Sequence, residues 1–251
     1  MPRPAAIVSC WSLAALAACA APSRTIRDSA AGASARDTAA VSSASDSSRG
    51  GGAVGEWRTL FDGTSTAQWR GYRADTMPSG WRIVDGALTR VAEGGDIVTR
   101  DVFRNFELTL EWNIAPGGNS GIMYRVREDS EHTYQSGPEM QVLDDARHPD
   151  GKSRLTSAGA LYGLYPSSPG VVKPAGEWNA VRIVVNGNHV EHWLNGVKVV
   201  EAELNSPDWK SRVAKSKFAA WPGFGAAPEG HIALQDHGDR VQYRNIRIRT
   251  L

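Results

Sequence analysis

Alternating hydrophobic and polar positions dominate the chain beyond residue 56, and they predict short β-strands. The segment 106–114 (FELTLEWNI) alternates over nine residues, and segment 181–185 repeats the pattern over a shorter run. Successive side chains of a strand point to opposite faces, so this pattern is typical of a sheet with one buried face. No segment keeps a helical period over three turns, and the strongest helix signal lies at 205–216, after a Ser-Pro-Asp start.

Two Asn-Gly pairs, Asn186-Gly187 and Asn195-Gly196, lie between strand patterns. Asn and Gly tolerate the positive φ angles of a tight hairpin turn, so the pairs predict a meander of three antiparallel strands over 177–204. The chain shows neither βαβ alternation nor a glycine-rich phosphate loop, which argues against a nucleotide or other organic cofactor. We therefore predict an all-β fold, a two-sheet antiparallel sandwich or jelly roll with at most short helices.

The first 19 residues have the pattern of an export signal. Arg3 precedes an apolar stretch over 5–18, which is too short to span a bilayer as an anchor. The end of this stretch, Leu-Ala-Ala-Cys19, resembles the lipobox of bacterial lipoproteins, in which the cysteine is acylated. The sequence thus predicts an exported protein of the bacterial cell envelope, anchored to a membrane by a lipid on Cys19. The alternative is a plain secretory signal cleaved nearby.

The chain divides into three parts by composition. Residues 20–55 follow the signal segment (1–19) and contain Ala, Ser, Gly, Asp, Thr and Arg but no aromatic residue. Such a segment cannot offset its ordering entropy by burial, so we interpret it as a disordered tether. The composition changes abruptly at Trp57, and we expect one folded domain over 56–251.

Charge and cysteine content exclude several classes of function. Lys and Arg number 28 against 27 Asp and Glu, for a formal net charge of +1, so nucleic acid is not an expected partner. The near-neutral charge carries no information on the oligomeric state. Both cysteines, Cys10 and Cys19, fall in the first 20 residues, which excludes a disulfide, a thiolate metal site and a cysteine nucleophile from the folded domain.

A polar run beginning at Glu139 is the most informative candidate site. Glu139 and Gln141 share a face of the predicted strand, whereas Asp144 joins them only if a β-bulge intervenes. The spacing Glu-x-Gln-x-x-Asp resembles the catalytic strand of laminarinase-type glycosidases, in which paired carboxylates serve as acid and base. The alternatives are an edge strand with solvated acids and a Ca²⁺ site formed by Asp144, Asp145 and Asp150.

Other segments add candidates for binding. Gln235 and His237 share a face at a strand end, where the alternative is a polar turn. In segment 189–196, His192 and Trp193 point to opposite faces, and parity leaves open which of them meets a ligand. Three candidates remain: Arg125 as a clamp for a carboxylate, Tyr162 as a wall of a sugar site, and His148 as a metal ligand together with Asp144 and Asp145.

Ordered motifs connect these candidates to a known family. They comprise LFDG at 60–63, GWxIxDGAL at 80–88, GGNSGIxYRV at 117–126, GPEMQVLDD at 137–145, GALYGLY at 159–165, GEWN at 176–179, HVEHWLNG at 189–196, SKF at 216–218, GHIALQDHG at 230–238 and RNIRI at 244–248. Together they resemble the 3-keto-disaccharide hydrolase domain family. The resemblance implies a concanavalin-like jelly roll, frequent export or lipid anchoring, and action on glycosides oxidised at carbon 3.

The resemblance also implies chemistry to which the candidates can be assigned. A ketone at carbon 3 acidifies the hydrogen on carbon 2, so a base can remove it and the group on carbon 1 leaves by β-elimination. Water then adds to the enone. Glu139, Asp144, His192 and His237 are the candidates for base, acid and metal ligands, and the preferred assignment is Glu139 as base, His237 as acid and Asp144 as an orienting or metal-binding residue. The expected contacts to the sugar are Arg125, Gln141, Gln235 and His192, with Trp193 or Tyr162 as a stacking platform. A divalent metal at the ketone is a further expectation, with Asp144, His148 and His237 as candidate ligands.

Two other classes of function remain open. A non-catalytic carbohydrate-binding module of the lectin or laminin-G type shares this sandwich and predicts sugar binding without turnover. A structural surface lipoprotein would use the same polar motifs only to stabilise loops.

Overall fold

The computed structural model describes residues 54–251. Positions 1–53, which include the predicted signal segment, the predicted lipidation site Cys19 and nearly all of the predicted tether, lie outside the described residues. The described part forms thirteen strands, one α-helix and three short 3-10 helices. The strands are β1 (Arg58–Phe61), β2 (Trp69–Gly71), β3 (Trp81–Val84), β4 (Ala87–Arg90), β5 (Ile97–Thr99), β6 (Phe106–Ile114), β7 (Asn119–Val126), β8 (Glu139–Leu143), β9 (Asn179–Asn186), β10 (His189–Leu194), β11 (Val197–Glu203), β12 (His231–Leu234) and β13 (Val241–Thr250). The helices are η1 (Thr133–Gln135), η2 (Pro149–Lys152), α1 (Pro207–Ala214) and η3 (Lys217–Ala220).

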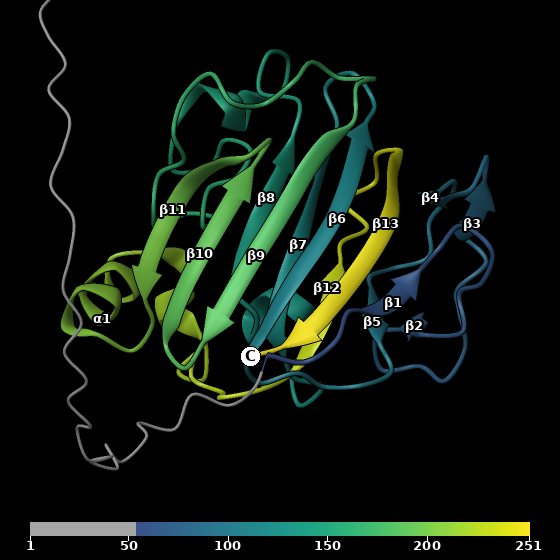
Figure 1. Cartoon of the computed structure of the whole chain (residues 1–251). Helices are drawn as coiled ribbons and strands as arrows, with labels where there is room; N and C mark the ends of the chain where they lie inside the picture. The colour runs from purple at the N-terminus through teal and green to yellow at the C-terminus, as the bar shows by residue number, and fades with distance from the viewer. Residues whose placement is uncertain (1–53) are drawn as a thin grey trace, which may run out of the picture. The chain divides into compact units, whose positions relative to one another are not determined.

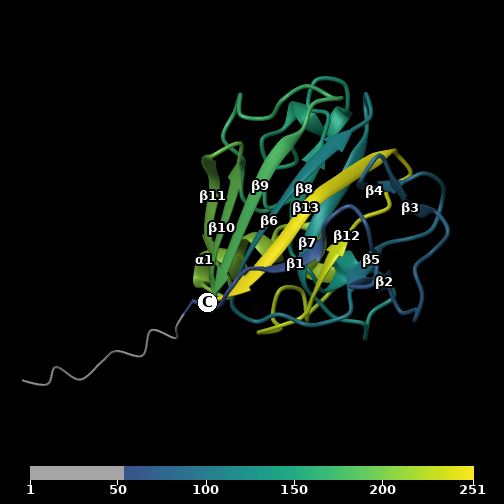
Figure 2. The ribbon, with the colours of Figure 1, turned by 45° about the vertical axis from the view of Figure 1, so that its right-hand side comes forward.

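The strands form two antiparallel sheets. The eight-stranded sheet has the order β11-β10-β9-β6-β13-β4-β3, and β1 also pairs with β13. The five-stranded sheet has the order β2-β5-β12-β7-β8. Figures 1 and 2 show the two sheets lying face to face, with β7, β8 and β12 behind β6, β9 and β13 in the view of Figure 1. The prediction of an all-β, two-sheet antiparallel sandwich is confirmed.

The main core fills the space between the sheets. Phe106, Leu108 and Trp112 of β6 alternate toward it and meet Ile122 and Tyr124 of β7. Each of these side chains is almost completely buried. Burial of one large apolar side chain stabilises the fold by about 1.5–3 kcal/mol, so the alternation of β6 fixes which face of the larger sheet packs inward.

The meander and the helix follow the sequence signals closely. Strands β9, β10 and β11 pair in order, and α1 begins after Ser206, whose hydroxyl accepts a hydrogen bond from Trp209 N at 3.1 Å. Asn195 and Gly196 form the second turn, with φ angles of 49° and 83°. The first turn is one residue later than predicted. Because β9 continues to Asn186, the turn residues are 187–188, and Gly187 supplies the positive φ of 59°.

Strand β8 ends the smaller sheet but is buried along its whole length. The segment 159–162 covers its outer edge: Gly159 N donates to Gln141 O at 2.9 Å, and Tyr162 N donates to Glu139 O at 3.0 Å. The face of this sheet that points away from the main core has its own small apolar cluster, formed by Val98, Met123, Val126 and Ala233, with Tyr72 and Tyr134 packed against it. Loops therefore partly enclose this second face. None of the helices within residues 54–251 has the length and apolar character that crossing a membrane requires.

Candidate active site

A small cavity of about 130 Å³ opens on the second face of the smaller sheet, and we call it the inner cavity. Strand β7 forms its floor. One wall consists of β8, the segment covering β8 and η3, and the opposite wall consists of η1 and the segment directly after β12. Its lining residues are Asn119, Tyr134, Glu139, Gln141, Tyr162, Lys217, Gln235 and His237. Five of them were predicted as site residues from the sequence: Glu139, Gln141, Tyr162, Gln235 and His237.

Strand register explains why residues distant in sequence share this face. Gly121 of β7 lies opposite Gln141, and Gln235 N donates to Gly121 O at 3.0 Å. Glu139 and Gln141 are two positions apart on β8 and therefore point to the same side. A Cβ atom on Gly121 would lie 2.2 Å from Glu139 Oε1. The glycine thus makes the space that the Glu139 carboxyl group occupies.

The Glu139 carboxyl group is strongly perturbed. The residue is only 8% exposed, and burial raises the pKa of its carboxyl group to about 8. The charge of Lys217 opposes this shift, whereas Asp96 and Asp150 add to it. Low dielectric surroundings disfavour the charged form, and a carboxylate with a raised pKa is a stronger base when it is ionised. A carboxyl group of this kind in a cavity is typical of proton-transfer sites.

Amide groups without protein partners surround this carboxyl group. Both Gln141 Oε1 and Gln141 Nε2 are buried with no hydrogen-bond partner among residues 54–251, and the same holds for Asn119 Oδ1 and Gln235 Oε1. A buried polar group that lacks a partner costs roughly 1–3 kcal/mol, so such groups gather where a ligand completes them. Amide groups on β7, on β8 and directly after β12 therefore suit a ligand that carries several hydroxyl or carbonyl groups.

A cation and a phenol form the wall near β8. Lys217 Nζ lies 4.5 Å from the ring centroid of Tyr162, and the Tyr162 hydroxyl donates to Asp150 Oδ2 at 3.2 Å. Burial raises the pKa of Tyr162 to about 12, so it remains a neutral hydrogen-bonding group. Lys217 is thus positioned to stabilise negative charge that develops beside Glu139.

Two aspartates hold the opposite wall, which carries Gln235 and His237. Asp236 accepts hydrogen bonds from Arg90 Nε at 2.7 Å, Gly94 N at 2.9 Å and Gly95 N at 3.0 Å. Asp96 accepts from Asp236 N at 2.8 Å and from the Thr133 hydroxyl. Burial raises the pKa of Asp96. The Asp96 carboxyl group thereby connects the segment that carries His237 to η1, which carries Tyr134.

Similarity to known proteins identifies the family of this chain. Residues 56–249 match the family described as the 3-keto-alpha-glucoside-1,2-lyase-like domain. The chain belongs to this family. The 3-keto-disaccharide hydrolase of Bacteroides thetaiotaomicron is 39% identical to it over 225 residues, which cover 77% of this chain and 78% of that protein. The family resemblance recognised from the ordered motifs is confirmed.

Solved structures support the fold of this lyase-like domain. The crystal structure of a proposed glycosyl hydrolase from Parabacteroides distasonis is 32% identical, has a TM-score of 0.72, and covers 78% of this chain and 94% of that chain. A Bacillus subtilis protein of unknown function with a galectin-like fold is 14% identical, with a TM-score of 0.50 over 79% of this chain and 96% of that chain, and shows the fold alone. The concanavalin-like jelly roll is confirmed, and family membership makes the chain an enzyme of the glycoside hydrolase or lyase class.

The structure of this lyase-like domain places Asp144 outside the inner cavity. Strand β8 ends at Leu143 without a bulge, so Asp144 turns away from the face of Glu139 and Gln141. Its carboxylate accepts hydrogen bonds from Gly117 N at 2.7 Å and Ala146 N at 3.2 Å. The expectation that Asp144 joins Glu139 is corrected: in this geometry Asp144 stabilises the loop after β8.

Arg125 also lies outside the inner cavity of the lyase-like domain. It sits in a bulge of β7 with a positive φ of 56°, and its guanidinium donates to Gly187 O in the β9–β10 turn. Burial lowers the pKa of this guanidinium. Arg125 therefore connects the two sheets at one end of the sandwich, which corrects its expected place as a contact to the substrate.

His192 and Trp193, which are neighbours in β10, also lie outside the inner cavity. His192 points into the core, where Nδ1 contacts Gly159 O at 3.1 Å and Nε2 contacts the Tyr124 hydroxyl at 3.1 Å. Because Gly159 O can only accept, Nδ1 carries the proton and Nε2 accepts from Tyr124. Trp193 lies on the outer face of the larger sheet, with the Arg182 guanidinium 4.9 Å from its ring centroid. The expected roles of both in sugar binding are corrected.

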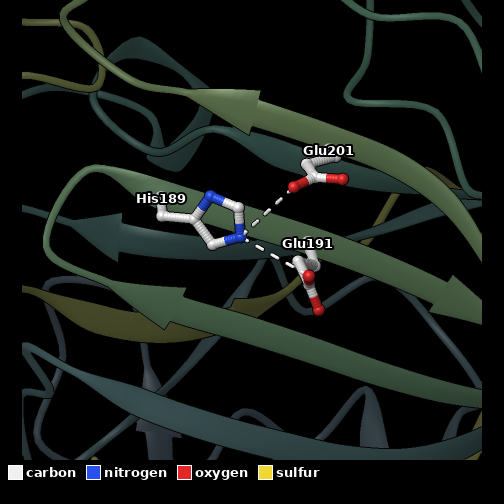
Figure 3. A group of neighbouring side chains, drawn as sticks. All are labelled: His189, Glu191 and Glu201. Carbon is white, nitrogen blue, oxygen red and sulfur yellow. Dashed lines mark hydrogen bonds and ion pairs between the residues drawn. The ribbon is translucent and has the colours of Figure 1, made fainter.

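The metal-ligand candidates of the lyase-like domain do not gather. His148 Nδ1 accepts from Asp150 N at 3.1 Å as the cap of η2, Asp144 binds backbone amides, and His237 lines the inner cavity. Among residues 54–251, the one cluster with the spacing of metal ligands is His189, Glu191 and Glu201 on β10 and β11, shown in Figure 3.

A positive charge already occupies that cluster. Lys198 Nζ lies 3.2 Å from Glu191 Oε1 and bonds to Glu201 Oε2. Trp193 Nε1 also donates to Glu191 Oε2 at 2.8 Å. The carboxylates are therefore paired within the sheet, and the group is a partly exposed ion-pair network on the face that points away from the main core.

Sequence reasoning missed three lining residues: Asn119, Tyr134 and Lys217. Asn119 lies in a recognised motif, two positions before Gly121, so alternation along β7 places it on the site face. Tyr134 and Lys217 belong to short 3-10 helices, and no local pattern indicates that these approach the sheet.

Proposed function

We propose that this enzyme cleaves 3-keto-glucosides by proton abstraction at carbon 2, β-elimination and rehydration. The observation that carries the proposal is the Glu139 carboxyl group, buried beside the Lys217 ammonium among amides that lack protein partners. Family membership supplies the substrate class, since the Bacteroides thetaiotaomicron relative is a 3-keto-disaccharide hydrolase.

The proposed reaction begins with the ionised Glu139 carboxylate. It takes the proton from carbon 2, and the electron pair of that C–H bond forms the enolate of the carbon 3 ketone. The Lys217 ammonium and the amides of Gln141 and Asn119 stabilise the enolate oxygen. The bond between carbon 1 and the glycosidic oxygen then breaks, and His237 donates a proton to the departing oxygen.

Water completes the reaction. It adds through its oxygen to carbon 1 of the enone, Glu139 returns its proton to carbon 2, and His237 regains a proton from the added water. The sum is one glycoside and one water giving one 3-keto sugar and one free alcohol. A divalent metal at the ketone would supply additional Lewis-acid stabilisation, and of its three expected ligands only His237 lines the inner cavity and could hold it.

The arrangement of carboxyl groups favours this route over ordinary glycoside hydrolysis. Glycosidases that pass through an oxocarbenium-like transition state use two carboxyl groups about 5–9.5 Å apart across the scissile bond. Among the described residues, Glu139 is the one carboxylate that lines the inner cavity. Asp96 does not line the inner cavity, and it accepts hydrogen bonds from the Thr133 hydroxyl and from Asp236 N, so it supports the site and does not act as a second catalytic carboxylate.

The test compares a 3-keto-glucoside that carries a chromogenic leaving group with its unoxidised parent, with and without a chelator. Release from the keto compound but not from its unoxidised parent supports the proposal. Loss of release in the presence of chelator would show that a metal contributes to catalysis. In D₂O the proton held by Glu139 exchanges with solvent between elimination and rehydration, so the sugar product is expected to carry deuterium at carbon 2. Release from neither compound, with sugar binding retained, would favour the alternative of a carbohydrate-binding module.

We also propose that the protein is exported and anchored to a membrane of the bacterial cell envelope through Cys19. The motif Leu-Ala-Ala-Cys at 16–19 supports this, and the segment lies outside the described residues. Metabolic labelling with a radioactive fatty acid tests it: the wild type is expected to carry label and Cys19→Ser is expected to carry none.

A further inference from the structure

The inner cavity continues into a larger hollow, which we call the outer hollow. The outer hollow has a volume of about 550 Å³ and shares Tyr134, Gln235 and His237 with the inner cavity. On the opposite side, a third hollow of about 410 Å³ shares Tyr162 and Lys217 with the inner cavity, and we call it the basic hollow. The inner cavity thus lies between two hollows of different volume, and the leaving group of a substrate bound in the cavity has to occupy one of them.

The positions of the proposed acid, His237, and the proposed base, Glu139, distinguish the outer hollow from the basic hollow. Glu139 lies on the wall shared with Tyr162, whose backbone N donates to Glu139 O. His237 lies on the other wall and belongs to both the inner cavity and the outer hollow. A general acid has to reach the leaving oxygen, so the group beyond that oxygen extends past His237. We propose that the outer hollow is the leaving-group subsite and that it takes a neutral aglycone with a flat aromatic or pyranose face; this rests on the proposed function.

Aromatic side chains make the outer hollow suitable for a ring. The rings of His132 and Tyr134 stack with their centroids 5.0 Å apart and an angle of 12° between their planes. Tyr72 forms another part of the lining, and its hydroxyl donates to Arg127 O at 2.8 Å and to Ser130 O at 2.7 Å. These bonds fix the position of the Tyr72 ring. Such ring faces suit the apolar face of a sugar or an aryl group.

Charge separates the two hollows further. The outer hollow is lined by Asp96, Glu131 and Asp236, and no lysine or arginine of the described residues lines it. The basic hollow is lined by Arg212, Lys215 and Lys217 and, within the same residues, by no carboxylate. An anionic leaving group would therefore be disfavoured in the first space and favoured in the second. The assignment of the leaving group thus predicts a preference for neutral over carboxylated aglycones.

The experiment measures kcat/KM for the full-length protein on 3-keto-glucosides with methyl, phenyl and 4-carboxyphenyl leaving groups. Each variant is compared with the wild type on the same substrate, so differences in intrinsic leaving-group reactivity cancel. His132 is exposed and lines only the outer hollow, so His132→Ala is expected to lower kcat/KM about three- to tenfold for phenyl and less than about twofold for methyl. His132→Phe keeps a flat ring, so its kcat/KM for the phenyl substrate is expected to return to the wild-type value.

Matched removal of charge tests the other half of the proposal. Glu131→Gln in the outer hollow is expected to raise the ratio of 4-carboxyphenyl to phenyl turnover about two- to fivefold, whereas Lys215→Gln in the basic hollow leaves that ratio unchanged. A ratio that falls with Lys215→Gln and ignores Glu131→Gln would place the leaving group in the basic hollow and overturn the proposal. Equal losses on methyl and phenyl substrates with His132→Ala would also overturn it. Failure of the proposed function is distinguishable, since the wild type would then release none of the three leaving groups.

Discussion

Glu139 of β8 and Gly121 of β7 are diagonal neighbours on adjacent strands, and the Glu139 carboxyl group fills the space that the absent side chain of Gly121 leaves. A Cβ atom at Gly121 would approach Glu139 Oε1 to 2.2 Å and Glu139 Cδ to 2.7 Å. Real Cβ atoms do not tolerate such contacts, so any side chain at this position must displace the carboxyl group. The glycine is therefore a positioning residue for the proposed base.

The first prediction follows from this contact. Gly121→Ala is expected to lower kcat on a 3-keto-glucoside about 10²-fold, because a displacement of about 1 Å costs roughly that much in a well-oriented reaction. Gly223→Ala is the matched control, since no atom lies within 4 Å of a Cβ at Gly223 and its φ is not positive. Circular dichroism and thermal unfolding check that both variants fold. Activity of Gly121→Ala within about threefold of wild type would show that the carboxyl group has no fixed position.

The second prediction separates Glu139 from Asp144. Glu139→Gln removes the proposed base and is expected to lower kcat by about 10²–10⁴-fold with the fold intact. Asp144→Asn weakens charged hydrogen bonds to Gly117 N and Ala146 N, and is expected to lower the free energy of unfolding by about 1–3 kcal/mol. Its kcat at a temperature where it is folded should stay within tenfold. Urea unfolding and initial rates measure both effects, and a reversed pattern would restore Asp144 to the chemistry.

Strand periodicity explains which site residues could be predicted from the sequence. Glu139 and Gln141, and likewise Gln235 and His237, are pairs two positions apart, so alternation alone assigns each pair to one face. Asp144 could not be assigned in this way, because its place depended on a bulge that β8 does not contain. The ordered motifs identified the family and hence the jelly roll, which local patterns restricted only to a sandwich.

The remaining site residues depend on tertiary packing. Strand alternation places His192 and Trp193 on opposite faces of β10, but only the packing of the two sheets determines which of these faces points into the core. Tyr134 and Lys217 reach the cavity from 3-10 helices that approach the sheet from other parts of the chain. Such approaches carry no periodic signal, so local patterns could not find these two residues.

The third prediction concerns the pH dependence of activity. The proposed base must be ionised to accept the carbon 2 proton, and burial raises the pKa of Glu139 to about 8. With proton abstraction as the step that limits kcat/KM, the value of kcat/KM is expected to rise with pH through a midpoint near 8. Lys217 favours the ionised carboxylate, so Lys217→Gln should move the midpoint to higher pH as well as lower the plateau. A pH–rate profile from about pH 5 to about pH 10 measures both.

A contrary result for this prediction would be equally specific. If Lys217→Gln lowered the plateau without moving the midpoint, Lys217 would act on the enolate alone and a group other than Glu139 would govern the rise. If the midpoint moved to lower pH, the cation would not favour ionisation of the base.

The last prediction concerns stability in acid and rests on His192. Burial lowers the pKa of this imidazole from 6.5 to about 4, so the folded protein keeps it neutral at pH values where the unfolded chain protonates it. The unfolded state thus binds the extra proton, and stability is expected to fall as pH decreases from about 6.5 through about 4, by roughly 3 kcal/mol in total from this residue. The glutamine of His192→Gln can donate to Gly159 O and accept from Tyr124 without titrating. The free energy of unfolding of this variant is therefore expected to fall less than that of the wild type over the same pH range. Urea unfolding at pH 7, 5.5 and 4.5 measures the difference between the two slopes, and parallel curves would show that His192 does not titrate differently on folding.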